Sequence, residues 1–357
     1  MIQRFLLLST LFLCSQLSAQ WTSFSTLSGG GSARLLGLGW DAYGHPGDVG
    51  FAAFNPASLM DVHKGQVSLS TQAALGGLRT GSLSYGLPLP KTNPSKGSSS
   101  IVQWDAQRGL HGWSKPAWNV AIGADYLHSG LLEERDPAGN LVGTFTAQEI
   151  TPRIAASAHW RTLTFGLGSK LAMMTYGPYT AQAIALDAGW IWSLDSGRTR
   201  IGLVVKNAGF NIEYFAGQRE SLPLDVQVTL SQKLKYAPFR WNVSYTHLER
   251  WDLRYSDPQL VTKDPLSGEI TVAQISALNN ALRHIHPSVE AQLGGRIFVQ
   301  VGYNIRRQVE MKLPTRRSNA GLSYGLSLQT RKMSYQFGSA VYHVAGRLNQ
   351  FTVVRRF

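Results

Sequence analysis

The sequence holds a single cysteine, Cys14, and it falls within the first twenty positions. Residues 1–19 are typical of a secretory signal peptide, because Arg4 gives a positive start, Phe5–Leu13 is apolar, and a cleavage site follows Ala19. A mature chain cut at that point has no cysteine, which excludes disulfides, thiol catalysis and cysteine-ligated zinc. The alternative, a lipoprotein cut before Cys14, is disfavoured because Leu13 is large where a small residue is expected.

Long hydrophobic runs are also missing. After the predicted signal peptide, no apolar stretch approaches the roughly 20 residues that a membrane helix needs. If the chain crosses a membrane, it must do so as a closed sheet, because lipid offers open backbone groups no hydrogen-bond partner. Charged residues make up only 15%, whereas 36 Gly, 10 Trp, 13 Tyr and 14 Phe suit a barrel with tight turns and aromatic girdles.

The sequence does contain a repeated alternation of apolar with small or polar residues, from about Lys64 to Phe357. A period of two places one set of side chains on one face of a strand. Clear cases are Ile184, Leu186, Ala188, Trp190 and Trp192; Ile297, Val299, Val301, Tyr303 and Ile305; and Ala320, Leu322, Tyr324, Leu326 and Leu328. We therefore predict an all-β fold, an antiparallel transmembrane β-barrel.

The same spacing locates the strands of this barrel. About fourteen are expected, an even number as in single-chain outer-membrane barrels. Their predicted ranges are Lys64–Leu75, Arg79–Leu87, Ala117–His128, Gln148–Trp160, Thr162–Met174, Thr180–Leu194, Arg198–Asn207, Leu222–Leu234, Phe239–Leu248, His286–Leu293, Arg296–Ile305, Asn319–Gln329, Lys332–Val341 and Arg347–Arg356.

Three parts follow from this pattern: the signal peptide, a plug or hatch segment at 20–63, and a barrel at 64–357 whose longest outer loop is 249–285. From the fourth strand on, short and long connections alternate, as expected for periplasmic turns and outer loops. The early part departs from this rule, because Pro88–Pro116 is long where a periplasmic turn belongs. The strand count between residues 76 and 116 is therefore the open point of the prediction.

The formal net charge of +13 raises the question of nucleic acid. An exported chain whose basic residues are scattered over many strands and loops does not fit that role. Anionic lipid head groups are the better counter-charge, and we expect no nucleic-acid partner and an outer-membrane location.

Motifs for catalysis or metal binding are weak. Gly321-Leu322-Ser323-Tyr324-Gly325 matches a nucleophile elbow by letters, but Ser323 lies inside an alternating strand and not on a strand-to-helix turn. His284 and His286 have no further ligand spaced nearby and fit a loop or barrel rim better than a metal site. No nucleotide or zinc-protease motif is present, so we expect no enzyme activity, catalytic residue, metal site or cofactor.

Two outer loops carry candidate contact residues. Glu249–Pro258 combines charge with aromatics and precedes a predicted helix at Val272–Arg283, and we assign partner contact to Trp251, Asp252, Tyr255 and Asp257. A barrel-capping loop is the alternative reading. The second loop is basic and could meet lipopolysaccharide phosphates or simply be solvated; its cations are Arg306, Arg307, Lys312, Arg316 and Arg317, against Glu310 alone.

Several segments resemble a known family. Ala33–Gly39 and the Asn55-Pro56-Ala57 tripeptide within Ala53–Leu59 resemble the N-terminal signature of the PorV/PorQ group, which is related to FadL-type barrels with an Asn-Pro-Ala hatch motif. The resemblance is closer to the PorQ branch of the type IX secretion system over Ser221–Pro258, Gly302–Leu313 and Ala340–Phe351.

This resemblance implies a role in the attachment complex of that secretion system. PorQ proteins work beside PorU, PorV and PorZ and hold PorZ at the surface, where the complex processes cargo and attaches it to lipopolysaccharide. PorQ is not the enzyme of the complex. The alternative implied by the FadL relation is an outer-membrane transporter of hydrophobic small molecules.

Overall fold

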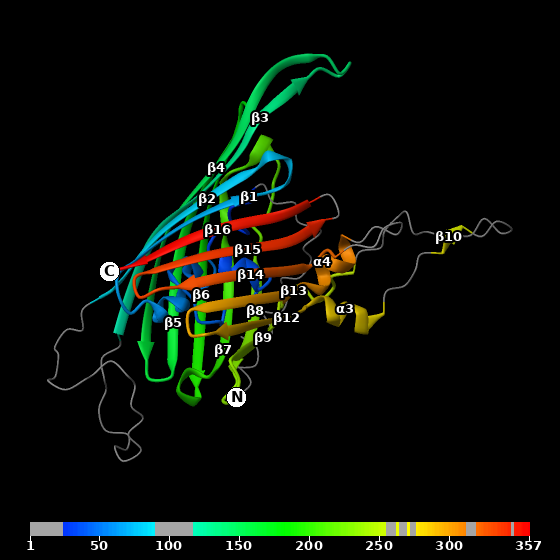
Figure 1. Cartoon of the computed structure of the whole chain (residues 1–357). Helices are drawn as coiled ribbons and strands as arrows, with labels where there is room; N and C mark the ends of the chain where they lie inside the picture. Colours follow the sequence, from blue (N-terminus) through cyan, green and yellow to red (C-terminus); the bar gives the residue numbers. More distant parts are fainter. Residues whose placement is uncertain are drawn as a thin grey trace, which may run out of the picture.

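The computed structural model describes residues 24–89, 117–254, 262–263, 270–271, 276–311, 319–343 and 346–357. Within these ranges fourteen strands form one closed antiparallel barrel, in which neighbours in the chain pair with each other and β1 closes onto β16 (Figure 1). They are β1 (Gln66–Ala73), β2 (Arg79–Pro88), β3 (Ala117–Arg135), β4 (Leu141–Trp160), β5 (Leu163–Tyr176), β6 (Tyr179–Leu194), β7 (Thr199–Glu213), β8 (Asp225–Lys233), β9 (Phe239–Tyr245), β12 (Ile285–Leu293), β13 (Ile297–Tyr303), β14 (Leu322–Gln329), β15 (Met333–His343) and β16 (Gly346–Arg356). Each predicted range overlaps one of these strands, so the predicted barrel is confirmed, although β3 and β4 are longer than predicted.

Shorter elements occupy the connections. They are η3 (Leu75–Gly77), η4 (Asp195–Gly197), η5 (Phe215–Gly217), the separate two-stranded pair β10 (Thr262–Lys263) and β11 (Ile270–Thr271), α3 (Ala277–Arg283) and α4 (Ile305–Glu310). The helix predicted at Val272–Arg283 is therefore observed only from Ala277, and residues 272–275 lie outside the described residues. The predicted signal peptide and residues 90–116 lie outside them as well.

Side chains alternate in the sense opposite to that of a water-soluble sheet. On β1 the polar residues Gln66, Ser68, Ser70 and Gln72 are buried inside the barrel, whereas Leu69 is 59% exposed on the outside. Large exposed apolar residues continue around the wall, at Leu83, Ile122, Ile154, Leu167, Leu186, Val301, Leu326, Phe337 and Phe351. An apolar outer face around a polar interior is the arrangement that a bilayer requires.

Exposed aromatic residues lie near both ends of the strands. Trp118, Trp160 and Trp192 lie close to the end with the short turns, and Tyr176 and Tyr179 lie at the opposite end. Such girdles sit at the two membrane interfaces. Among the described residues, no helix has both the length and the apolar character needed to cross a membrane.

The lengths of the connections orient the barrel. Apart from the long connection 89–116, one end has the short turns 161–162, 195–198, 234–238, 294–296 and 330–332. The other end has the longer connections 214–224, 246–284 and 304–321. The second end is therefore the outer one. The connections between β1 and β2 and between β5 and β6 are tight even at that end.

Strands β3 and β4 extend beyond the rim of the barrel. Pairing of β2 with β3 stops at Arg79 and His128, and pairing of β4 with β5 stops at Ala147 and Tyr176. Beyond these points β3 and β4 pair only with each other, with a register shift after His128. The hairpin projects as a two-stranded ribbon at the top of Figure 1.

The N-terminal segment fills the lumen as a plug. It contains α2 (Ala33–Gly37), η1 (Val49–Ala53) and η2 (Pro56–Asp61). Helix α2 packs against β13 to β16, whereas η2 packs against β3 to β6 on the other side of the barrel. The plug supplies most of the fully buried apolar side chains among the described residues, including Leu35, Leu36, Phe51, Phe54 and Leu59.

Buried ion pairs join the plug to the wall. Arg34 donates from Nε and Nη2 to the two carboxylate oxygens of Glu290 on β12, at 2.7 and 2.6 Å. Glu290 also lies 3.1 Å from His45 Nε2 and accepts from Gln300 at 3.0 Å. On β7, three strands further around the wall, Arg200 donates to both oxygens of Asp61 at 2.9 Å.

Glycines on the wall make room for the backbone of the plug. A Cβ added to Gly166 on β5 would overlap the backbone of Ala57, and one added to Gly189 on β6 would overlap the Asn55 side chain. Gly302 and Gly338, on the far wall, abut the plug backbone in the same way at Leu38 and Ala33. The plug therefore packs directly against the backbone of several barrel strands.

Asn55 fixes the geometry of the hatch motif. Its side chain accepts from Ala57 N–H and donates to the Tyr43 carbonyl, each at 3.0 Å, and it is 1% exposed. We expect Asn55→Ala to lower the free energy of unfolding by about 1–3 kcal/mol, because both backbone groups lose a partner in a dry site. Urea unfolding in detergent micelles measures this, and an unchanged midpoint would contradict it.

Candidate functional site

The outer end of the barrel encloses a cavity of about 960 Å³, here called the outer vestibule. The plug residues Trp40, Asp41 and Tyr43 form its floor, and strand ends and outer connections form its wall. Ionisable side chains dominate the lining, namely Lys206, Asp225, His247, Glu249, Arg250, Asp252, Arg254, Arg306, Arg307 and Glu310. Pockets for small molecules are lined mainly by hydrophobic side chains, so this cavity suits polar groups and water.

Polar contacts hold the floor of the vestibule to the barrel wall. Asp41 Oδ2 lies 2.5 Å from His286 Nδ1, and the Asp41 carbonyl accepts from the Ser244 hydroxyl at 2.5 Å. Burial alone would raise the pKa of the Asp41 carboxyl, but the neighbouring His286 brings that pKa below its ordinary value. Tyr43 accepts from Lys206 Nζ at 2.8 Å. These contacts fix the plug across the lumen beneath the vestibule.

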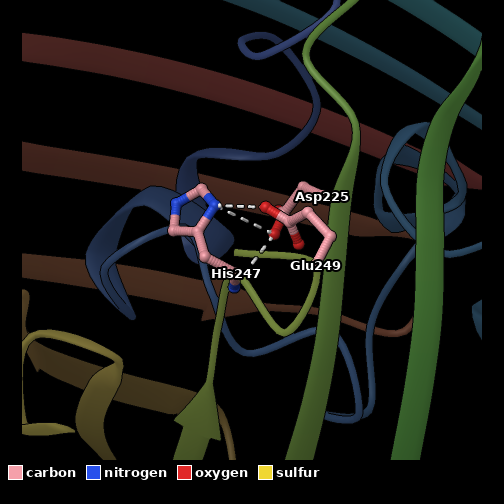
Figure 2. Close-up of side chains that lie close together, drawn as sticks. All are labelled: Asp225, His247 and Glu249. Carbon is pink, nitrogen blue, oxygen red and sulfur yellow. Dashed lines mark hydrogen bonds and ion pairs between the residues drawn. The ribbon is translucent and has the colours of Figure 1, made fainter. Parts of the chain in front are cut away.

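Asp225, His247 and Glu249 lie together on the vestibule wall (Figure 2). Asp225 is the first residue of β8, and the pairing of Val228 with Tyr245 brings the segment after β9 beside it. His247 Nδ1 lies 3.0 Å from Glu249 Oε1 and 3.6 Å from Asp225 Oδ1. His247 has a left-handed backbone, with φ +55°, which costs a non-glycine residue about 1–2 kcal/mol.

Two cations flank this cluster. Lys206 Nζ lies 2.9 Å from Asp225 Oδ2, and Arg306 Nη1 lies 2.7 Å from His247 Nε2. Because arginine can only donate, Nε2 accepts in this arrangement and the imidazole proton is on Nδ1, where it donates to Glu249. The cluster offers one nitrogen and two carboxylates, the donor set in the described residues that could hold a metal ion.

Trp251 and Asp252, two of the predicted contact residues, lie at the rim of the vestibule. The Trp251 ring is 62% exposed and stacks on His284 at 5.5 Å, and His284 stacks in turn on Tyr245 at 4.9 Å. Asp252 pairs with Arg254 at 2.7 Å, and hydrogen bonds from Arg254 hold the pKa of the Asp252 carboxyl below its usual range. The other two predicted residues, Tyr255 and Asp257, lie outside the described residues.

The predicted lipopolysaccharide contacts are split in the same way. Arg306 and Arg307 lie on α4 and line the vestibule, where Arg306 pairs with Glu310 at 2.8 Å and Arg307 lies 4.7 Å above the Tyr342 ring. The sequence placed them in a loop facing outward. Lys312, Arg316 and Arg317 lie outside the described residues.

Other singled-out residues have structural positions. His286 is the second residue of β12, at the outer end of that strand, where it is buried against Asp41, and His284 lies in the connection just before β12, buried beneath Trp251. Ser323 lies inside β14, with no strand-to-helix turn around it. The hatch motif Asn55-Pro56-Ala57 begins η2, deep in the lumen against β5 and β6.

Sequence reasoning missed Asp225, His247 and Glu249. Asp225 and His247 fall inside predicted strands and Glu249 opens the predicted contact loop, and alternation along a strand assigns a face to a side chain but does not say which other side chains lie beside it. The tight turn at 234–238 was available as a signal, because hairpin register counted back from it brings Asp225 opposite the segment that carries the other two.

No protein-family model matches the sequence, and no curated protein is similar enough to count as a relative. The fold matches the Ralstonia pickettii toluene transporter TbuX with a TM-score of 0.51 and 12% identity, over 93% of this chain and 99% of that one. It matches a Pseudomonas aeruginosa FadL homologue with a TM-score of 0.50 and 10% identity, over 92% and 99%.

The chain is an outer-membrane β-barrel with the FadL-type fold. Its apolar outer face, its polar interior and its plugged lumen agree with this conclusion. At this level of identity the likeness concerns the fold alone; the first neighbour is named a transporter and the second a FadL homologue.

Proposed function

We propose that this chain is a PorQ-type, non-enzymatic component of the attachment complex of the type IX secretion system. In this role it anchors the surface protein PorZ and works beside PorU and PorV, where cargo is processed and attached to lipopolysaccharide. The sequence segments that resemble the PorQ branch support the assignment. The barrel supplies a stationary platform in the outer membrane.

The observation that carries the proposal is the ordered aromatic rim. Trp251 is exposed, yet its ring is held by stacking on His284 and its carbonyl accepts from Asn280 at 2.6 Å. An exposed aromatic that is already fixed loses little conformational entropy when it docks, which makes it a good interface anchor. Asp252, fixed by Arg254, supplies a charge beside it that can set the orientation of a partner.

We expect Trp251→Ala with Asp252→Asn to weaken PorZ retention by about 2 kcal/mol or more, roughly 30-fold in affinity, because a hot-spot aromatic is lost. The measurement is the amount of PorZ that co-purifies with the barrel after gentle detergent extraction. Tyr236→Ala is the matched control, since Tyr236 is 89% exposed in a turn at the opposite end of the barrel. Undiminished PorZ on the rim variant would count against the anchor.

The second candidate is a transporter of hydrophobic small molecules. The fold shared with a toluene transporter favours it, as does the hatch motif. The ionisable lining of the vestibule and the ion-paired plug beneath it disfavour an apolar ligand. Uptake of a labelled aromatic hydrocarbon by cells with and without the chain discriminates the two: loss of uptake on deletion supports transport, and normal uptake with lost PorZ supports the anchor.

A further inference from the structure

The three facing atoms of the Asp225, His247 and Glu249 cluster have the spacing of ligands around one metal ion. All lie within 4.8 Å of one another, and His247 Nδ1 lies 3.0 and 3.6 Å from the two carboxylate oxygens. Zinc binds nitrogen and oxygen at about 2.0–2.2 Å, which places neighbouring ligands of a tetrahedral site roughly 3.3–3.6 Å apart. The cluster therefore requires little movement to receive an ion.

The carboxylates are already oriented by other contacts. Glu249 uses Oε2 to accept from Val226 N–H at 2.8 Å, and Asp225 uses Oδ2 for Lys206 at 2.9 Å. Each carboxylate thus turns its other oxygen, Oε1 or Oδ1, toward His247, and Asp225 Oδ1 also accepts from the His247 backbone N–H at 3.4 Å. Outer contacts of this kind are what fix the ligands of metal sites.

We propose that Asp225, His247 and Glu249 bind a divalent first-row transition metal, of which Zn²⁺ is the best match. An imidazole nitrogen with two carboxylates favours zinc or its neighbours over calcium and magnesium, which take oxygen ligands. Because the three residues line the vestibule, the open coordination position faces the cavity, where water completes the sphere. The site does not depend on PorZ and stands apart from the proposed anchoring function.

Arg306 is the competitor of the metal. With no ion, it donates to His247 Nε2 and so places the imidazole proton on Nδ1. Metal binding at Nδ1 moves that proton to Nε2, which then repels the Arg306 donor, and Arg306 must turn away while keeping its 2.8 Å contact with Glu310. Lys206 beside Asp225 also opposes a dication, so the two cations set how tightly the ion is held.

The test uses the full mature chain, without a histidine tag, in detergent micelles. Zn²⁺ is titrated against a chromophoric chelator, and Co²⁺ absorption reports the coordination geometry. We expect one saturable site, weakened about tenfold or more in His247→Gln and in Glu249→Gln. The control is His286→Gln, because His286 lies in the same cavity but faces the single carboxylate of Asp41. No saturable binding to the parent chain, or an equal loss in the control, would overturn the site.

A second variant separates a metal site from a plain ion-pair network. We expect Arg306→Gln to bind Zn²⁺ about tenfold more tightly, because the amide oxygen can accept from Nε2–H and no cation opposes the ion. Unchanged or weaker binding would show that Arg306 does not compete with the metal and would overturn this part of the inference. Circular dichroism checks that each variant keeps the barrel.

Discussion

Arg34→Met is expected to lower the free energy of unfolding by about 3–5 kcal/mol, the cost of breaking a buried pair and leaving one charge without its partner. Arg34 meets both carboxylate oxygens of Glu290, and both residues are buried in the lumen. His45 and Gln300 remain as weaker partners for the carboxylate. Urea unfolding in micelles, followed by tryptophan fluorescence, measures the loss.

The matched control is Arg135→Met. Arg135 pairs with Glu133 at 2.6 Å, but both side chains are more than half exposed on the projecting hairpin. An exposed pair of this kind contributes at most about 1 kcal/mol, so the control should unfold close to the parent chain. Equal losses of stability in the two variants would mean that the buried Arg34–Glu290 pair contributes no more to the free energy of unfolding than an exposed ion pair does.

Gly189→Val tests the fit between plug and wall. The added carbons would overlap the side chain of Asn55, which is itself fixed by two backbone groups and cannot move aside cheaply. We expect a loss of about 3 kcal/mol, at the upper end for an overpacked core, or displacement of the plug. Limited proteolysis within residues 24–63 detects displacement, and urea unfolding detects the loss of stability.

Gly81→Val on β2 controls for the change of residue alone. A Cβ at Gly81 would have only the Ser70 carbonyl nearby, at 3.9 Å, so a valine fits and suits a strand. The control should therefore match the parent chain. If Gly189→Val were as stable as Gly81→Val, that result would contradict the close contact between Asn55 and the barrel wall.

The strands of this barrel were predictable because the physical cause of the pattern is local. Each strand separates lipid from lumen, and that boundary forces a period of two that can be counted in the sequence. The extension of β3 and β4 beyond the rim was not predictable in this way. There the alternation no longer faces lipid, and a register shift after His128 interrupts it.

The candidate site was predictable only in part. Composition placed Trp251 and Asp252 in a contact loop, and the structure places them at the rim of the vestibule. The inward positions of Arg306 and Arg307 depend on the folding of α4 over the cavity, which no periodicity reveals. Likewise, the matching of Gly166 and Gly189 to the plug depends on residues more than a hundred positions away in the chain.

The contacts of the plug with the first and last strands have a consequence for assembly. Gly31 accepts from Ser70 on β1 at 2.6 Å, Ala33 donates to Thr352 on β16 at 2.8 Å, and Ser70 meets Thr352 at 2.5 Å. The plug thus bridges, from inside the lumen, the pairing of β1 with β16 that closes the barrel. Since β16 is the last barrel strand in the chain, we expect the plug to favour the pairing of β16 with β1. A barrel without the plug should therefore close more slowly.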